Sequence, residues 1–233
     1  MRLARILVLI AILTFSCASS PRYDDPQVQA QNYPLRTLSV IVYSDNSDQK
    51  DEIYGFIRSV SNILEYQVGI KLKVAAFNPI KIPEKVLIQH PDGKLEYVKS
   101  YTQCGSLALL ERKTLSSYSE KSFDISILFM KRPSAESWGQ LMVWNGVIDG
   151  SARRYIVMKV LDEYSLVHEI GHAFIFSHVH SSEGVMKESL WGFGTSWFNE
   201  EDRVEILRNK KRDFSEAPRV RASNIKPSDF IPK

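Results

Sequence analysis

The chain has 233 residues, of which 44% are hydrophobic and 24% are charged, and its formal net charge is +3. Two of its 30 basic residues, Arg2 and Arg5, lie in an N-terminal segment that we expect to be removed, which leaves 28 basic against 27 acidic residues. This near-neutral balance argues against nucleic acid as a partner. With Cys17 and Cys104 as the only cysteines, the composition also excludes a disulfide framework.

The first residues resemble an export signal. Arg2 and Arg5 precede an apolar run at 6–13, which is too short to span a bilayer. The small residues around Cys17 resemble a bacterial lipoprotein signal, with a signal peptide at 1–17 and Cys17 as the acylated first residue that anchors the protein to a membrane. The alternative is ordinary cleavage after Ala18. Either way we expect export, to the outer membrane, cell surface or periplasm, or into the medium.

Hydrophobic patterning predicts one domain of ordinary size that mixes strands and helices. A polar tether at 18–35 precedes the domain at 36–214, and a tail follows at 215–233. The patterns predict strands at 37–43, 70–77, 124–130 and 155–160, helices at 48–68 and 106–118, and a hairpin turn at 91–93. Gly69 is expected to end the first helix, and Asp162 and Asn199 to cap two later ones.

The most informative segment is H-E-I-G-H-A-F-I-F-S-H at 168–178. On a helix, His168 and His172 lie one turn apart on one face, as two ligands of a zinc ion require. Glu169 is placed to deprotonate the water that such an ion activates. The apolar residues of this helix fall on the opposite face, where we expect packing: Leu166, Ile170, Ala173 and Phe174.

A third nitrogen is expected from His178, which would leave one position of a tetrahedral zinc ion open for water. A helix continued that far would point this ring about 120° away from the metal, so the chain has to turn near 175–177. Glycine is the usual residue for a left-handed turn, but position 175 is Ile, where that conformation costs about 1–2 kcal/mol. The turn falls on Ile175 under strain, or on Phe176 or Ser177. His180 is the alternative third ligand.

The segment resembles the signature of the metzincin zinc peptidases, with Ile175 in place of the family's glycine. Metzincins also have a methionine in a tight turn beneath the metal. Here Met186 lies eight residues after His178, the interval of the matrixin branch. The resemblance is specific at 168–186 and diffuse elsewhere. It implies an α+β fold with a twisted, mostly parallel sheet, an active-site helix, a Met-turn and a C-terminal helix.

Other features follow from the resemblance alone. Residues 139–149 correspond to the family's substrate-pairing edge strand. Four residues follow the Met-turn, where the family forms its specificity pocket, or else they pack in the core: Leu190, Trp191, Phe193 and Trp197. Cys104 precedes a glycine, as does the cysteine that keeps matrixins latent, but it lies inside the domain, so we expect a buried or idle thiol. Calcium, which the resemblance allows, has no signal in the sequence.

The sequence therefore predicts an exported zinc metalloendopeptidase with one catalytic ion and peptide or protein substrates. Glu169 would take the proton of the attacking water and pass it to the leaving amine. One alternative is a site of two histidines and a glutamate, whose third ligand is Glu183, Glu188 or Glu200. The other is a catalytically degenerate metzincin fold that serves as a surface binding lipoprotein, for which Ile175 is the one favourable feature. Substrate specificity and oligomeric state are left open.

The signal predicts a covalent lipid. Metabolic labelling with a palmitate analogue should tag the wild-type protein and leave Cys17→Ser untagged, because the substitution removes the acylated sulfur. A wild-type protein released without label would contradict the lipoprotein prediction, though not export.

Overall fold

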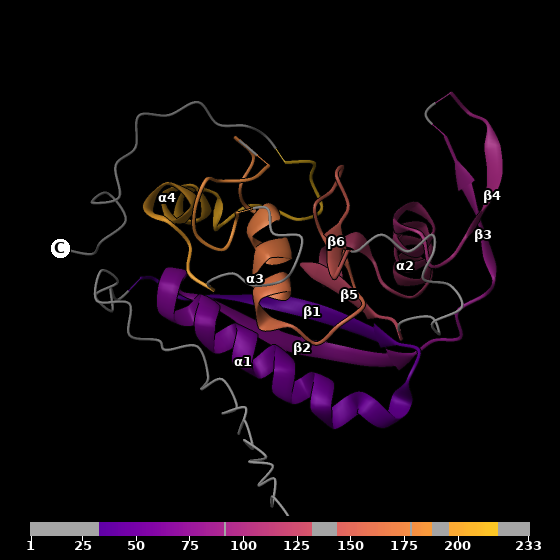
Figure 1. Ribbon diagram of the computed structural model, residues 1–233, viewed down its shortest axis with the longest axis horizontal. Helices are drawn as coiled ribbons and strands as arrows, with labels where there is room; N and C mark the ends of the chain where they lie inside the picture. The colour runs from indigo at the N-terminus through magenta and orange to yellow at the C-terminus, as the bar shows by residue number, and fades with distance from the viewer. Residues whose placement is uncertain (1–32, 91, 132–143, 178, 188–195, 219–233) are drawn as a thin grey trace, which may run out of the picture.

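A computed structural model describes residues 33–90, 92–131, 144–177, 179–187 and 196–218 (Figure 1). The signal peptide with Cys17 and most of the tether therefore lie outside the described residues. The elements in chain order are β1 (Arg36–Ser44), η1 (Ser47–Gln49), α1 (Lys50–Val68), β2 (Ile70–Pro79), β3 (Lys85–Gln89), β4 (Leu95–Lys99), α2 (Gln103–Ser117), η2 (Glu120–Ser122), β5 (Ile125–Phe129), β6 (Gly146–Ile148), β7 (Tyr155–Met158), α3 (Glu163–His172) and α4 (Glu200–Asn209).

Five strands form one sheet in the order β2-β1-β5-β7-β6. The pairs β1–β2, β1–β5 and β5–β7 are parallel, and β6 alone runs antiparallel, against β7 at the edge. The described sheet is thus mostly parallel, as predicted. Part of the predicted edge strand at 139–149 is β6, while 139–143 lie outside the described residues.

Alternate residues of the central strands face two hydrophobic clusters, because successive side chains of a strand point to opposite faces. Leu38, Val40 and Val42 join the cluster that contains the buried sides of α1, α3 and α4. Ile41 and Tyr43 join the cluster of the other face, which α2 covers through Leu110. The candidate metal helix α3 and the C-terminal helix α4 therefore share one face of the sheet.

The local signals of the sequence correspond to real element ends. Gly69 ends α1 in the left-handed conformation, at φ 64°. The side chain of Asp162 accepts a hydrogen bond of 2.9 Å from the backbone N–H of Ser165 at the start of α3. Asn199 does the same for Asp202 at the start of α4, at 2.8 Å. These predictions are confirmed, and α2 begins three residues earlier than the predicted 106.

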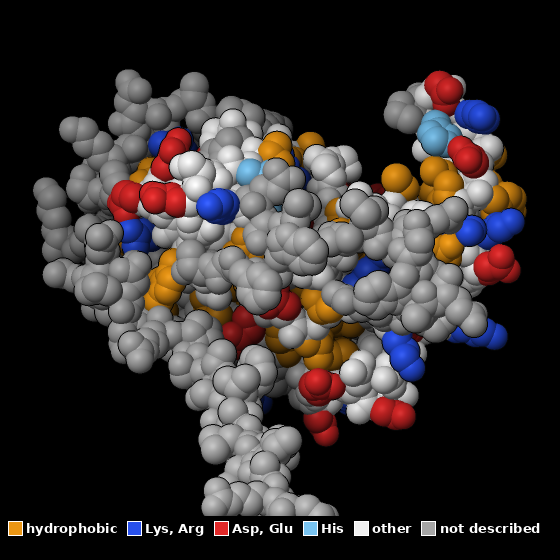
Figure 2. Space-filling model, in the orientation of Figure 1, with side chains coloured by type: hydrophobic (Ala, Val, Ile, Leu, Met, Phe, Trp, Pro, Cys, Tyr) orange, Lys and Arg blue, Asp and Glu red, His pale blue; other side chains and the backbone are white. Residues whose placement is uncertain are grey.

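The predicted turn at 91–93 joins β3 and β4 into a hairpin that stands clear of the sheet (Figures 1 and 2). Hydrophobic and charged side chains lie along it (Figure 2), and Leu95 and Tyr97 are 59% and 68% exposed. Among the described residues, no helix has the length and apolar character needed to cross a bilayer.

Candidate metal centre

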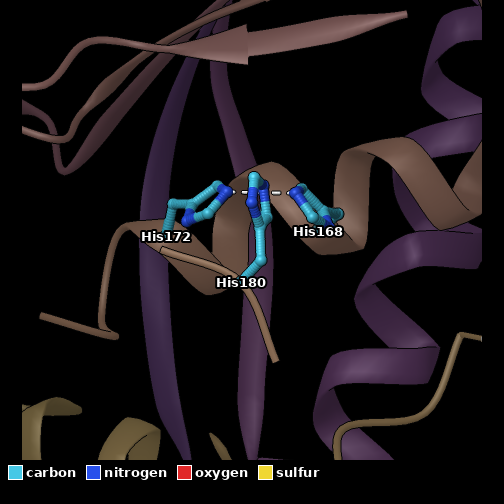
Figure 3. A group of neighbouring side chains, drawn as sticks. All are labelled: His168, His172 and His180. Carbon is cyan, nitrogen blue, oxygen red and sulfur yellow. Dashed lines mark hydrogen bonds between the residues drawn. The ribbon is translucent and has the colours of Figure 1, made fainter. Parts of the chain in front are cut away.

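Three histidines converge beside α3 (Figure 3). His168 and His172 come from the helix and His180 from the segment that follows it, and one ring nitrogen of each lies within 4.8 Å of the others. The Nε2 atoms of His168 and His172 are 3.0 Å apart. Two nitrogens on a tetrahedral zinc ion are separated by about 3.3 Å, given Zn–N bonds of about 2.0–2.1 Å. The residues present therefore fit zinc with little movement.

A backbone carbonyl on the side of the ring away from the other histidines orients the His168 imidazole. Its Nδ1 atom lies 2.7 Å from the backbone carbonyl oxygen of Val185. A carbonyl only accepts hydrogen bonds, so Nδ1 carries the proton and Nε2 is left with the lone pair that a metal needs. Metal-binding histidines usually have such a partner, which fixes both the tautomer and the ring orientation.

Val185 belongs to the tight turn that contains Met186. Gly184 has φ 75°, and its carbonyl accepts from the N–H of Lys187 at 3.2 Å. Met186 is fully buried against α3: a Cβ added at Gly171, between the two helical histidines, would lie 2.4 Å from the Met186 sulfur. The methionine thus lies beneath the helix at the histidine pair, in the place that the resemblance implies for it.

Glu169 lies between α3 and the edge strand. Its side chain is buried, with the residue 8% exposed, and its carboxylate accepts a hydrogen bond from the backbone N–H of Ile148 in β6. Burial raises the pKa of Glu169 to about 8, and the Ile148 hydrogen bond acts in the opposite direction. Gly146 permits this approach, because a Cβ there would lie 2.9 Å from Cγ of Glu169.

The exit from α3 differs from expectation. The helix ends at His172, and Ala173 follows with φ −66° and ψ −18°. Within 173–177 no residue has positive φ; among all described residues other than glycine, only Arg153 does, at 51°. The expected left-handed turn at Ile175, Phe176 or Ser177 is therefore wrong. Ile175 is fully buried and free of that strain.

The other predicted site residues have mixed outcomes. His178, Glu188, Leu190, Trp191 and Phe193 lie outside the described residues. Glu183 and Glu200 do not belong to the ligand cluster found in the described part of the chain. Trp197 makes an edge contact with the ring of Tyr66, at 5.8 Å between centroids. Cys104 is an exposed thiol in the first turn of α2.

Sequence reasoning missed two carboxylates that organise the surroundings of the site. Asp149 accepts four backbone N–H bonds in the β6–β7 loop, from residues 152–155, at 2.6–3.0 Å. Glu205 on α4 accepts from the backbone of Phe176 and Ser177. Both are single acidic residues with no motif around them, so their roles had no signal in the sequence.

Comparison with known proteins supports the fold. No family model and no curated protein matches the chain. The structure is similar to the crystal structure of archaemetzincin from Methanopyrus kandleri, with a TM-score of 0.51 and 18% identity over 76% of this chain and 97% of that one. Metalloproteinase-II from Bacteroides fragilis aligns with a TM-score of 0.45 and 16% identity over 78% of this chain and 58% of that one. The similarity to archaemetzincin shows that the two chains share a fold.

The contact between Gly171 and the Met186 sulfur can be tested with a single methyl group. Gly171→Ala should destabilise the protein by about 1–3 kcal/mol, because the methyl displaces the buried methionine, and it should weaken zinc binding as the turn beneath His168 shifts. Gly55→Ala is the control, since a Cβ at that helical glycine meets nothing within 4 Å; it should be neutral or stabilise by about 0.5–1 kcal/mol. Thermal unfolding and zinc titration measure both. Equal behaviour of the two variants would contradict the packing described.

Proposed function

We propose that the protein is a zinc-dependent endopeptidase. The observation that carries the proposal is the convergence of three imidazole nitrogens within 4.8 Å beside a buried glutamate on the same helix. Three protein ligands with one open position are typical of catalytic rather than structural zinc sites. The fold shared with archaemetzincin supports the same assignment.

We assign the third ligand to His180. Its ring lies 5.4 Å from that of His168 and 5.6 Å from that of His172, between centroids, as expected for rings that share one ion. His178, which the motif spacing predicts, is the competing candidate. With His180 the ligands follow the spacing H-E-x-x-H and then seven residues before the last histidine, two more than the metzincin pattern.

When bound, zinc supplies a Lewis acid that activates water and polarises the carbonyl group to be attacked. Glu169 supplies the base: its carboxylate takes a proton from the attacking water and delivers it to the leaving amine. A cation held by the histidines would favour the ionised carboxylate, opposing the effect of burial. The edge strand β6 lies directly against Glu169, and such an edge can hold an extended peptide by adding it as a strand. This position supports cleavage within chains rather than at their ends.

The alternative of a catalytically degenerate binding protein has less support once the conformation of Ile175 is known. Ile175 was the one feature that favoured a degenerate binding protein, and it occupies the exit from α3 without positive φ. Export and acylation of Cys17 are part of the proposal and rest on the sequence alone, since Cys17 lies outside the described residues.

If Glu169 acts as the base and does not bind the metal, a substitution there should reduce turnover without reducing zinc binding. Glu169→Gln should keep zinc and the fold but lose at least about 10²–10⁴-fold in activity, because the amide cannot accept the proton. Zinc content, circular dichroism and cleavage of casein or a peptide library measure these effects. If folded, zinc-loaded wild type cleaves nothing and the variant behaves identically, the peptidase proposal fails and the binding lipoprotein takes its place.

The assignment of the third ligand predicts unequal effects of two neighbouring substitutions. Purified protein should hold about one zinc ion per chain, which a chelator removes. His180→Ala should weaken zinc binding much more than His178→Ala does, because the His180 ring faces the other two ligands. Zinc titration in competition with a chelator gives both affinities. The reverse order would return the third ligand to His178 and the metzincin spacing.

A further inference from the structure

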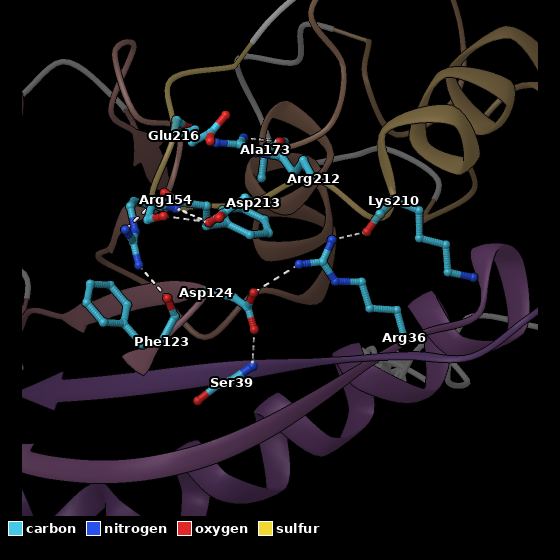
Figure 4. A network of polar contacts seen from close by, with 12 residues as sticks. Arg36, Ser39, Phe123, Asp124, Arg154, Ala173, Lys210, Arg212, Asp213 and Glu216 are labelled. Atoms are coloured by element: carbon cyan, nitrogen blue, oxygen red, sulfur yellow. Dashed lines mark hydrogen bonds and ion pairs between the residues drawn. The ribbon is translucent and has the colours of Figure 1, made fainter. Parts of the chain in front are cut away.

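The N–H groups of residues 173–175 donate to carbonyls of the last helical turn, but the carbonyl groups of the segment that leaves α3 are bound by side chains. Four consecutive carbonyls, of residues 172–175, accept hydrogen bonds from side chains of distant segments. Arg153 donates to His172 at 3.1 Å and to Ile175, Arg212 to Ala173 at 2.6 Å, and Asn209 to Phe174 at 2.7 Å. Figure 4 shows Arg212 reaching Ala173 at the end of the helix. The run begins at His172, the last residue of the helix, and continues through the C-cap Ala173 to Ile175, where no further helical turn supplies donors.

Glu205 completes the set from the other side. One carboxylate oxygen accepts from the backbone N–H groups of Phe176 and Ser177, and the other accepts from the Ser177 hydroxyl. Glu205 and Asn209 are 7% and 8% exposed, so water cannot readily replace them. The guanidinium groups of Arg153 and Arg212 also lie over the Phe176 ring, at 5.3 and 5.4 Å from its centroid.

Helix α4 also binds the chain directly after His180. Asp202 accepts a hydrogen bond of 2.7 Å from the Ser181 hydroxyl. Asp202 and Glu205 are three residues apart on α4 and so lie on one face of it. One face of α4 therefore fixes Ser177 and Ser181, the two ends of the short segment that carries His180.

We propose that Arg153, Glu205, Asn209 and Arg212 form a turn clamp that positions His180 for the metal and replaces the left-handed glycine as the means of leaving the helix. None of the clamp residues belongs to the three-histidine cluster, and they act through the backbone that leads to His180, so they are positioning residues. The inference rests on the proposed zinc site, because it concerns how that site is assembled.

The structure offers a matched pair of substitutions at Glu205. Glu205→Gln keeps a carbonyl oxygen that can accept from both backbone N–H groups, and an amide that can donate to the Ser177 hydroxyl. Glu205→Met has a similar volume, but its thioether sulfur is only a weak acceptor and cannot replace the two carboxylate oxygens. Loss of a residue that orients a ligand commonly costs 10–100-fold in metal affinity.

The test uses Co²⁺ in place of zinc, because the visible absorption of Co²⁺ reports its coordination geometry without any substrate. In the mature wild-type protein we expect the intense bands of four-coordinate cobalt. Glu205→Met should bind Co²⁺ roughly 10–100-fold more weakly and with weaker bands, while Glu205→Gln should restore both. Leu110→Ala, which loses core packing on the opposite face of the sheet, should lower the melting temperature but leave the spectrum unchanged.

A second variant keeps the test valid if Glu205→Met does not fold. Arg153 has φ 51°, so Arg153→Gly removes its guanidinium from the carbonyls of His172 and Ile175 without straining the backbone. Like Glu205→Met, Arg153→Gly should bind Co²⁺ more weakly and give weaker absorption bands. Wild-type affinity and spectrum in a folded Glu205→Met or Arg153→Gly protein would overturn the clamp. Failure of folded wild type to bind Co²⁺ would instead overturn the metal site itself.

Discussion

The requirement that three imidazoles meet at one point governs the arrangement of this molecule. A helix can supply two of them, because residues four apart share a face. It cannot supply the third, because the next histidines along the chain would point away from the ion if the helix continued. The chain therefore has to leave α3 directly after His172 and bring His180 back over the helix. This abrupt exit has an energetic cost, which hydrogen bonds from the surrounding structure offset.

That cost consists of backbone groups left without partners at the end of a helix. Many helices resolve it with a glycine in the left-handed conformation, which closes hydrogen bonds within the chain itself. Here Ile175 is buried without positive φ and its N–H donates to the Gly171 carbonyl, while distant side chains donate to the carbonyls of residues 172–175. Positively charged donors suit this end of a helix, where the carbonyls concentrate partial negative charge. The exit thereby depends on α4 and the β6–β7 loop being in place.

The position of Glu169 depends in turn on the edge strand β6. The carboxylate of Glu169 accepts from Ile148 and lies against Gly146, both in the edge strand. Any side chain at Gly146 would enter the space of the base, which explains a glycine inside a strand where it otherwise weakens pairing. The same short strand therefore positions the Glu169 carboxylate and forms the edge of the described sheet, along which an extended peptide would lie in the proposed function.

The sequence by itself determined the parts that depend on local periodicity and capping: the central strands, α1 with its glycine end, the caps at Asp162 and Asn199, and the placement of His168, Glu169 and His172 on one helix. Spacing favoured His178 over His180, but it could not establish which ring reaches the other two, because both follow a non-helical turn whose path is set by other segments. Glu205, Arg153 and Asn209 gave no signal, since each acts on backbone far away in the chain. Tertiary structure decided the turn, because a buried helix end takes its hydrogen-bond partners from whatever the fold packs against it.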